Sequence, residues 1–563
     1  MVSIYISFFC YKDKKNREMN VLITFCLVLL LKAVALPMPL FTDVTSQSGI
    51  DFRHTNGAGE SKFVIETVGP GVGFFDYDSD GFLDIYLING AATPGTEFEI
   101  TPQNALYRNL RDGGFADVTD ASKTGDEGYG MGVAAGDYDN DGNIDIYLGN
   151  FGANVLYRNI GDGTFEDVSI SAGVVDRRWT TSCAFSDVDR DGFVDLYAAN
   201  YHDFSYTNHR VCSEGGSGLQ LYCGPEAFDG VGDVLYRNLG NGKFIDVTES
   251  SGLLREDGKE LGVVFGDVDM DGDSDLYLAN DKTLNFLFLN SGDGTFSEVG
   301  LISGASYNED GDVEAGMGVD MGDYDNDLSP DLFVTNFQWE TNTLYRNLGD
   351  GTFLDETYIA GLGKGSIPYL SWGTRFCDFN NDGHRDIFIA NGHLESDVEI
   401  YENATFAQRN QLFLNEGDGH FQEFSAQNGA LTIEKVSRGA AFGDYDVDGD
   451  IDVLVANIND SPSLMRNDTE AKNHWIRLQL IGSESNKSAI GARAEVYSGG
   501  LMQTDEVRSG ASFLSQSAMS LHFGLGSSDI LDKVVVFWPS GVVDTLRQLS
   551  VDKIVVVSEG SSK

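Results

Sequence analysis

This 563-residue sequence is poor in basic side chains, cysteine and proline. Its 37 lysines and arginines stand against 88 aspartates and glutamates, which gives a formal charge of −51. Such a chain repels phosphate backbones, so we expect no nucleic acid among its partners. After residue 35 the sequence has no apolar run long enough to cross a bilayer, so we expect no membrane span once that segment is removed.

Familiar catalytic signatures are also missing. The sequence has no H-E-x-x-H motif and no Ser-His-Asp order that would indicate a metalloprotease or a serine hydrolase. An Arg-Gly-Asp tripeptide is absent as well, so nothing supports ligand mimicry of that type.

The first 35 residues have the pattern of an export signal. A basic flank precedes an eleven-residue apolar run, Val21–Leu31, and Ala33-Val-Ala35 fits a small-x-small cleavage site. Met19 is a possible alternative start of the same signal, and a membrane anchor is the alternative reading of the segment. We therefore predict a signal peptide at 1–35 and a secreted, extracellular protein, or a periplasmic or cell-surface one in a bacterium.

Seven copies of one acidic nonapeptide, D-x-[DN]-x-D-G-x-x-D, run along the chain. Oxygen-bearing side chains on alternate residues of a tight loop can converge on one hard divalent cation, as at the start of an EF-hand loop. Oxygen-only ligands favour Ca²⁺, so we predict up to seven calcium ions, structural rather than catalytic. The predicted ligands are Asp76, Asp78, Asp80 and Asp84; Asp137, Asp139, Asp141 and Asp145; Asp187, Asp189, Asp191 and Asp195; Asp267, Asp269, Asp271 and Asp275; Asp323, Asp325, Asp327 and Asp331; Asp378, Asn380, Asp382 and Asp386; and Asp444, Asp446, Asp448 and Asp452.

Two copies depart from the pattern. The fifth has Leu328 where the others have glycine, and a leucine at that turn needs a strained backbone. The sixth has Asn380 in place of an aspartate, which keeps the oxygen but removes a charge. We expect the fifth loop to be the weakest metal site.

Each acidic loop is embedded in a longer repeat. An asparagine lies five residues after the last aspartate, a Leu-Tyr-Arg-Asn-like segment follows, and a glycine-rich turn leads to a phenylalanine, as in 145–165. These segments predict four short antiparallel strands per repeat, which is typical of a propeller blade. The seventh repeat lacks its outer strand, and Phe41–Thr45 supplies a matching one. We predict an all-β seven-bladed propeller over 40–467, followed by a small β-sandwich-like domain over 468–563.

Loop lengths and cysteines single out the third repeat. Extra residues fall between the +5 asparagine and the next strand, most of all in the third repeat, on the face opposite the acidic loops. Cys212 and Cys223 lie in this insertion, and we predict that they form a disulfide. Cys183 and Cys377 are interpreted as buried free thiols.

The repeats resemble the FG-GAP/VCBS calcium-binding repeats of integrin α-chain propellers, most closely at Ala441–Gly449. The tail is similar to the ASPIC/UnbV domain, through Asn473–Leu478, Arg508–Gln516, Leu521–Gly526 and Phe537–Gly541. Together the two resemblances cover about 40–560 and identify the chain as a member of the cartilage acidic protein-like family. The resemblance implies a secreted calcium-binding protein and brings no catalytic residues.

Our leading functional hypothesis is an extracellular adhesion or interaction module for protein or glycan, contacted on the face opposite the acidic loops. Aromatic residues beside polar groups suit sugar stacking, so the candidate contacts are Arg178, Trp179, Tyr201, His202, Trp372 and His393. The alternative is a propeller enzyme, a lyase, dehydratase or dehydrogenase, with its active site in a central funnel. Such a site could gather His54, His202, His393 and Arg438.

Overall fold

The computed structural model describes residues 38–214, 218–425, 428–469 and 473–562. The predicted signal peptide at 1–35 lies outside the described residues. Within the described ranges no helix combines the length and the apolar character that crossing a membrane requires. Almost all regular structure in these ranges is β-strand, as predicted.

Seven four-stranded antiparallel sheets form the larger part of the structure. In each sheet the strands follow one another from the inside of the ring outward, and neighbouring inner strands β2, β6, β10, β16, β20, β24 and β30 contact in turn, with β30 returning to β2. The predicted seven-bladed propeller is therefore confirmed. The blades are β2 (Val72–Phe75), β3 (Asp84–Leu87), β4 (Ala105–Asn109) and β5 (Phe115–Asp117); β6 (Tyr129–Gly136), β7 (Asp145–Phe151), β8 (Val155–Asn159) and β9 (Phe165–Asp167); β10 (Thr180–Ser186), β11 (Asp195–Asn200), β14 (Val234–Asn238) and β15 (Phe244–Asp246); β16 (Glu260–Gly266), β17 (Asp275–Asn280), β18 (Phe286–Asn290) and β19 (Phe296–Glu298); β20 (Val319–Gly322), β21 (Asp331–Val334), β22 (Thr343–Asn347) and β23 (Phe353–Asp355); β24 (Ser371–Cys377), β25 (Asp386–Asn391), β27 (Gln411–Asn415) and β28 (Phe421–Glu423); and β30 (Ser437–Gly443), β31 (Asp452–Asn457), β32 (Ser463–Asn467) and β1 (Phe41–Asp43).

The N-terminal strand closes the ring. β1 pairs antiparallel with β32, with Phe41 opposite Asn467 and Asp43 opposite Met465. Phe41 is buried in the core between blades six and seven, against Phe379 at 5.4 Å between ring centroids. The first and last repeats are thus joined in one sheet, as the missing outer strand of the seventh repeat predicts.

Short elements join these strands. The one-turn helices follow outer strands, and two small hairpin-like pairs lie in loops. They are α2 (Thr119–Ser122), α3 (Ser169–Ala172), α4 (Thr248–Ser251), α5 (Gly300–Ser303), α6 (Gly363–Ser366), the 3₁₀ turns η1 (Thr45–Gln47), η2 (Val64–Thr67), η3 (Pro225–Ala227), η4 (Val398–Ile400) and η6 (Gly429–Thr432), and the strands β12 (Cys212–Ser213), β13 (Gln220–Leu221), β26 (Gln408–Arg409) and β29 (Glu434–Lys435).

One asparagine per blade ties each blade to its predecessor. In blade two the Asn159 amide donates to the carbonyl of Ile144 in its own acidic loop at 3.1 Å and to that of Tyr77 in the previous loop at 2.8 Å. The same two bonds recur at Asn109, Asn238, Asn290, Asn347, Asn415 and Asn467. This asparagine therefore links adjacent acidic loops around the ring.

The C-terminal strands form a three-stranded and a four-stranded sheet. The three-stranded sheet has the order β36 (Leu521–Gly526), β33 (His474–Ile481), β39 (Lys553–Ser558). The four-stranded sheet has the order β35 (Leu501–Glu506), β34 (Arg493–Ser498), β37 (Ile530–Phe537), β38 (Val543–Ser550). Their apolar core is continuous with that of blades two and three, so these strands pack on the propeller and share its interior.

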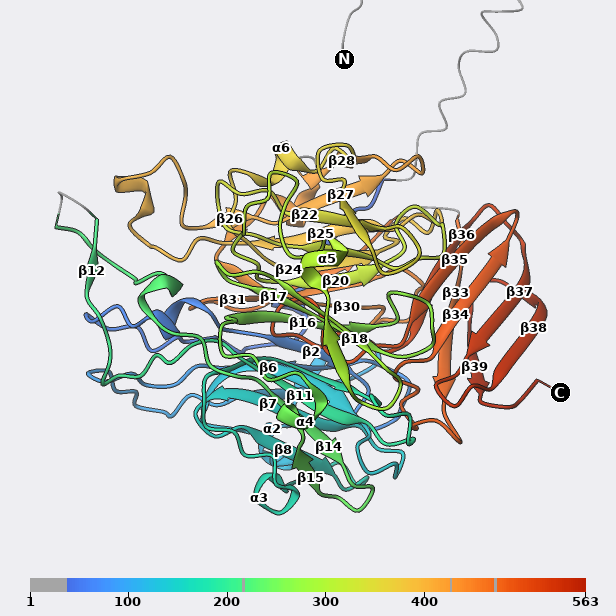
Figure 1. Ribbon diagram of the computed structural model, residues 1–563, viewed down its shortest axis with the longest axis horizontal. Helices are drawn as coiled ribbons and strands as arrows, with labels where there is room; N and C mark the ends of the chain where they lie inside the picture. Colours follow the sequence, from blue (N-terminus) through green and yellow to red (C-terminus); the bar gives the residue numbers. More distant parts are fainter. Residues whose placement is uncertain (1–37, 215–217, 426–427, 470–472, 563) are drawn as a thin grey trace, which may run out of the picture. The chain divides into compact units, whose positions relative to one another are not determined.

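The C-terminal strands lie over the acidic loops. The Ser488 hydroxyl accepts from the Asp137 backbone amide at 2.9 Å, the Arg477 guanidinium donates to Asp444 at 2.9 Å, and His522 contacts the Asn381 side chain at 2.6 Å. In Figure 1 these strands are at one side of the propeller, and β12 projects at the other. The longer connections between second and third strands therefore extend from the face of the propeller opposite the acidic loops.

A segment of the C-terminal region fills the centre of the ring. Residues 509–518 connect β35 to β36 and make hydrogen bonds to inner strands of six blades. The partners are Phe74, Ala135, Ser182, Val319, Thr374 and Phe442. Phe513 and Leu514 in the segment are fully buried, and Phe513 contacts Trp372 at 4.9 Å between ring centroids. We call residues 509–518 the axial plug.

Candidate metal centre

Each acidic loop connects the inner strand of a blade to the next strand and is held open by its own hydrogen bonds. In the first loop the two Asp76 oxygens accept from the amides of Asp80 and Gly81 at 3.0 and 2.8 Å. The last aspartate, Asp84, accepts from the amides of Tyr77 and Asn109 at 3.1 and 2.8 Å. First and last carboxylates are thus oriented by backbone donors, and their remaining lone pairs are left for a cation.

The carboxylate at the third position of the loop is different. In five loops its Oδ1 atom is buried and has no hydrogen-bond partner; the five residues are Asp78, Asp139, Asp189, Asp269 and Asp446. A buried anionic oxygen without a donor is costly, so its repetition at one position points to a positive group that belongs there. Sequence spacing alone predicts this position as a ligand but not its unsatisfied state.

The fifth and sixth loops satisfy this position within the protein. Asp325 Oδ1 accepts from the Asp327 amide at 3.2 Å, and its other oxygen accepts from Arg346 at 2.8 Å. Asn380 Oδ1 accepts from the Asp382 amide at 3.0 Å, while its own amide donates to the Asp382 carboxylate at 3.0 Å. These are the two loops whose sequences depart from the consensus.

The geometry of the loops fits a calcium ion. Six groups of three or more carboxylates in the described residues have ligand atoms within 4.8 Å of one another, five of them in loops one to five. All potential ligands are oxygens, which suits Ca²⁺. The backbone supports the turn, because the sixth residue lies in the left-handed region, from φ 89° at Gly81 and Gly192 to φ 97° at Gly449. Leu328 has φ 74°, so the strain predicted for the fifth loop is present.

Burial changes the acidity of these carboxyls. Burial, together with the nearby Asp78 carboxylate, raises the pKa of Asp84 to about 8. Burial, together with the Asp269 carboxylate, likewise raises the pKa of Asp275 to about 8. The pKa values of Asp145, Asp195, Asp331, Asp386 and Asp452 are also raised by burial. Without a cation the cages are therefore partly protonated at neutral pH, and a bound dication would displace those protons.

The residues predicted as a possible ligand face are mostly in the interior. Trp179, Tyr201, His202, Trp372 and His393 are each at most 3 % exposed. Arg178 is partly exposed, but its guanidinium is paired with Asp176 at 2.7 Å. As they stand, these side chains do not form a surface for a ligand.

Their packing explains the burial. Trp179 contacts the rings of Tyr201 and His202 at 5.1 and 4.8 Å, and His202 stacks on Phe228 at 4.6 Å. Trp372 donates to the Gly392 carbonyl at 2.8 Å and lies under the Arg438 guanidinium at 4.0 Å. The aromatic residues thus fill the space beneath the third-repeat insertion and beside the axial plug.

The cysteine predictions agree with the structure. Cys212 and Cys223 form a disulfide that links β12 to the chain two residues after β13. Cys183 and Cys377 are free and buried. The disulfide stabilises the insertion that covers the aromatic cluster.

Fold and loops together define a seven-bladed propeller of the FG-GAP type. The FG-GAP-like repeat model matches residues 76–148, 137–198, 267–334, 323–389 and 378–455, and the ASPIC and UnbV model matches 482–563. The repeat matches together cover more than half of the chain. The chain therefore belongs to the FG-GAP-like repeat family and carries an ASPIC/UnbV domain.

Curated relatives share this architecture at low identity. The chain is 27 % identical over 306 residues to human cartilage acidic protein 1, covering 53 % of this chain and 43 % of that protein. It is 25 % identical over 290 residues to the Xenopus tropicalis protein of the same name, covering 50 % and 42 %. The match thus spans less than half of the length of these relatives.

Solved structures match the propeller only distantly. BBS1N in complex with ARL6DN aligns with a TM-score of 0.41 and 8 % identity, covering 77 % of this chain and 98 % of that one. A Bacillus licheniformis rhamnogalacturonan lyase aligns with a TM-score of 0.39 and 11 % identity, covering 80 % and 78 %.

Proposed function

We propose that this protein is a secreted, calcium-stabilised propeller that acts as an extracellular interaction module for another protein. The observation that carries the calcium assignment is the buried Oδ1 atom without a donor at the third position of five loops. Loops one, two, three, four and seven would each hold one ion, with the first, third, fifth and ninth side chains as ligands. Bound ions stabilise the fold because they bind only its folded state.

Export is supported by two further observations. The Cys212–Cys223 disulfide is of a kind that persists in oxidising compartments. The curated relatives carry the name cartilage acidic protein 1. Both agree with the secreted protein that the sequence of 1–35 predicts.

The interaction surface we propose lies on the face opposite the acidic loops. Large apolar side chains are exposed in the connections between second and third strands of blades one, three, five and six. They are Phe98 (40 % exposed), Ile100 (85 %), Val211 (73 %), Trp339 (53 %) and Ile400 (73 %). Exposed apolar residues on elaborated loops of a rigid scaffold favour a recognition role.

The chemistry of this surface favours protein over glycan. Trp179, Tyr201 and Trp372, the aromatic residues predicted for sugar stacking, are buried, whereas three of the five exposed side chains are aliphatic. The enzyme alternative has less support, because the axial plug fills the centre of the ring where a funnel site would lie, and Phe513 and Leu514 there are fully buried. Among the residues considered for such a site, the Arg438 guanidinium donates to backbone carbonyls, including those of Thr67 and Gly392.

The test compares two double variants. Ile100→Asp with Ile400→Asp alters the proposed face, and Ile170→Asp with Ile302→Asp is the matched control at equally exposed isoleucines on α3 and α5. Each is titrated against a panel of purified extracellular proteins and a glycan array, in calcium and in EGTA. We expect a protein partner whose affinity falls at least tenfold for the first variant only. Equal binding by both variants, or binding to glycans alone, would contradict the proposal.

A further inference from the structure

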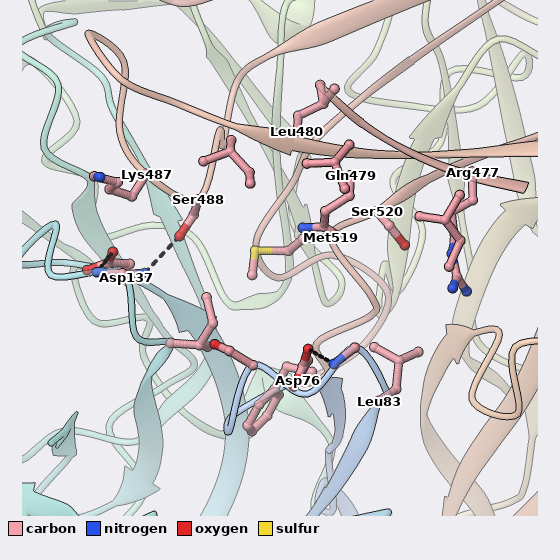
Figure 2. Close-up of a pocket in the computed structure, with 18 of the residues that line it drawn as sticks. Asp76, Leu83, Asp137, Arg477, Gln479, Leu480, Lys487, Ser488, Met519 and Ser520 are labelled. Carbon is pink, nitrogen blue, oxygen red and sulfur yellow. Dashed lines mark hydrogen bonds between the residues drawn. The ribbon is translucent and has the colours of Figure 1, made fainter. Parts of the chain in front are cut away.

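A cavity of about 500 Å³ lies between the C-terminal strands and the acidic loops of blades one, two and seven. Figure 2 shows Asp76 and Leu83 on one side, Gln479, Met519 and Ser520 across from them, and Lys487 and Arg477 toward the two ends. Its volume is that of a small-molecule site. None of the functions considered so far uses it.

One wall is the outer face of the β33–β39 pair. These strands run parallel, with Arg477 opposite Ile554 and Gln479 opposite Val556. Because successive residues of a strand alternate between faces, the intervening Ile476 and Leu478 enter the apolar core of the C-terminal sheets instead. The face toward the cavity therefore carries Arg477 and Gln479 from β33 and two exposed apolar residues from β39, Val556 (60 % exposed) and Ile554 (38 %).

Two cationic side chains line the cavity. Arg477 is buried, and its Nη1 group donates to the carboxylate and carbonyl of Asp444. Its Nε and Nη2 groups make no hydrogen bond with described residues. Lys487 is exposed, and its ammonium makes no ion pair within the described part of the chain. The Nε and Nη2 groups of Arg477 and the Lys487 ammonium therefore remain as donors for an anionic group in the cavity.

The remaining charges in the wall belong to three acidic loops. Asp76, Asp137 and Asp444 are the first-position residues of loops one, two and seven. The inference rests on the proposed function at this point, because loops one, two and seven carry twelve predicted carboxylate ligands, and three Ca²⁺ ions would offset half of that charge and weaken the repulsion of an anion. Arg477 and Lys487 are the cationic side chains of the lining.

We infer that this cavity binds a small organic carboxylate with an apolar body. The carboxylate would accept from Arg477, whose fork of donors suits a planar two-oxygen group, with Lys487 adding a second positive charge. The apolar body would lie on Ile554, Val556 and Met519. The two cations of the lining and the exposed apolar residues of β39 are the features that favour this class of ligand.

The test uses 2-naphthoate, which combines a carboxylate with an apolar ring system, and its neutral isostere 2-naphthamide. Binding to the full chain is measured by calorimetry in 1 mM calcium. We expect 2-naphthoate to bind at least tenfold more tightly than 2-naphthamide. Val556→Asp should weaken 2-naphthoate at least tenfold and Lys487→Met about threefold to tenfold, since neither side chain is needed for packing.

The matched control is Val543→Asp, the same change at a 51 % exposed valine on β38 outside the cavity, which should leave affinity within twofold. Equal affinity of Val556→Asp and the unsubstituted chain, or equal binding of amide and carboxylate, would overturn the inference. Calcium content is measured on the same samples. Loaded loops without 2-naphthoate binding would defeat the cavity assignment alone, whereas naphthoate binding by a chain that holds no calcium would defeat the proposed role of the loops.

Discussion

Loops three and six have the same spacing, and among their four predicted ligand side chains they differ only at the third position. In loop three Asp189 leaves a buried oxygen without a donor, whereas in loop six Asn380 accepts from one group and donates to another inside the loop. A single amide thus converts a cage that needs a cation into a turn that satisfies itself. The spacing of the acidic residues identifies the loop. Whether the third-position Oδ1 atom already has a hydrogen-bond donor identifies which loops need an ion.

The largest expected effect is the removal of all ions. Five sites at about 2.7 kcal/mol each, for calcium at a hundredfold excess over Kd, would lower Tm by an amount on the order of 10 °C in EGTA. The measurement is scanning calorimetry with and without chelator, with calcium loss verified by elemental analysis. An unchanged Tm in calcium-free protein would remove the structural role of the loops.

A single-loop change should separate the two kinds of loop. Asp189→Ala removes the unsatisfied oxygen of loop three and should lower the calcium content by one ion and the stability in calcium by about 3 kcal/mol. Asp325→Ala is the matched change in loop five, where the Oδ1 atom already accepts from the Asp327 amide. It should leave the ion count unchanged. Loss of one ion from both variants would show that hydrogen bonding of the third-position Oδ1 atom does not decide which loops bind calcium.

Opposite pH dependences should distinguish the loaded from the calcium-free protein. Burial raises the pKa of Asp84 and Asp275 to about 8 in the calcium-free fold, above the ordinary value of 3.8. The folded state then binds protons more tightly than the unfolded state, so stability is fully present below about pH 4 and is lost as pH rises to about 8. Calcium competes with those protons, so its binding strengthens over the same rise.

The measurement is Tm between pH 5.5 and 8, in EGTA and in calcium. We expect the EGTA curve to fall and the stabilisation by calcium to grow as pH increases. If Tm changed with pH in the same way in EGTA and in calcium, calcium would not compete with protons for the buried carboxyls.

The smallest effect concerns the strained fifth loop. Leu328→Gly removes a left-handed leucine at φ 74° and should raise stability by about 1 kcal/mol without adding an ion. Asn326→Gly is the control at φ 59°, where asparagine already tolerates the conformation, and its gain should be smaller. Differential scanning calorimetry of both variants measures the change in stability. A loss of stability in Leu328→Gly would contradict the strain assigned to the fifth loop.

Local pattern was sufficient for the blades and the ring. Six of the seven blades take all four strands from one continuous repeat, and Phe41–Thr45 carries the same outer-strand pattern as its six counterparts. The Cys212–Cys223 pair was also predictable, because the two cysteines are close in sequence. Each of these features depends on residues near one another in the chain or on repetition.

The features that escaped prediction depend on distant contacts. Arg508–Gln516 is a distinctive segment, but its place at the axis is set by strands more than a hundred residues away, such as β2 and β24. Trp179 and His202 were predicted as possible ligand contacts. Their burial could not be foreseen, because it depends on Phe228 and Phe204 in an irregular insertion. Nothing in local periodicity signals how such a loop folds back.

Counting and locating calcium tests the central claim most directly. Crystals grown in calcium, with anomalous scattering used to place each ion, should show one ion in each of loops one, two, three, four and seven, bound through the oxygens of Asp78, Asp139, Asp189, Asp269 and Asp446. Loops without ions at those five oxygens, or ions held equally in loops five and six, would contradict the account.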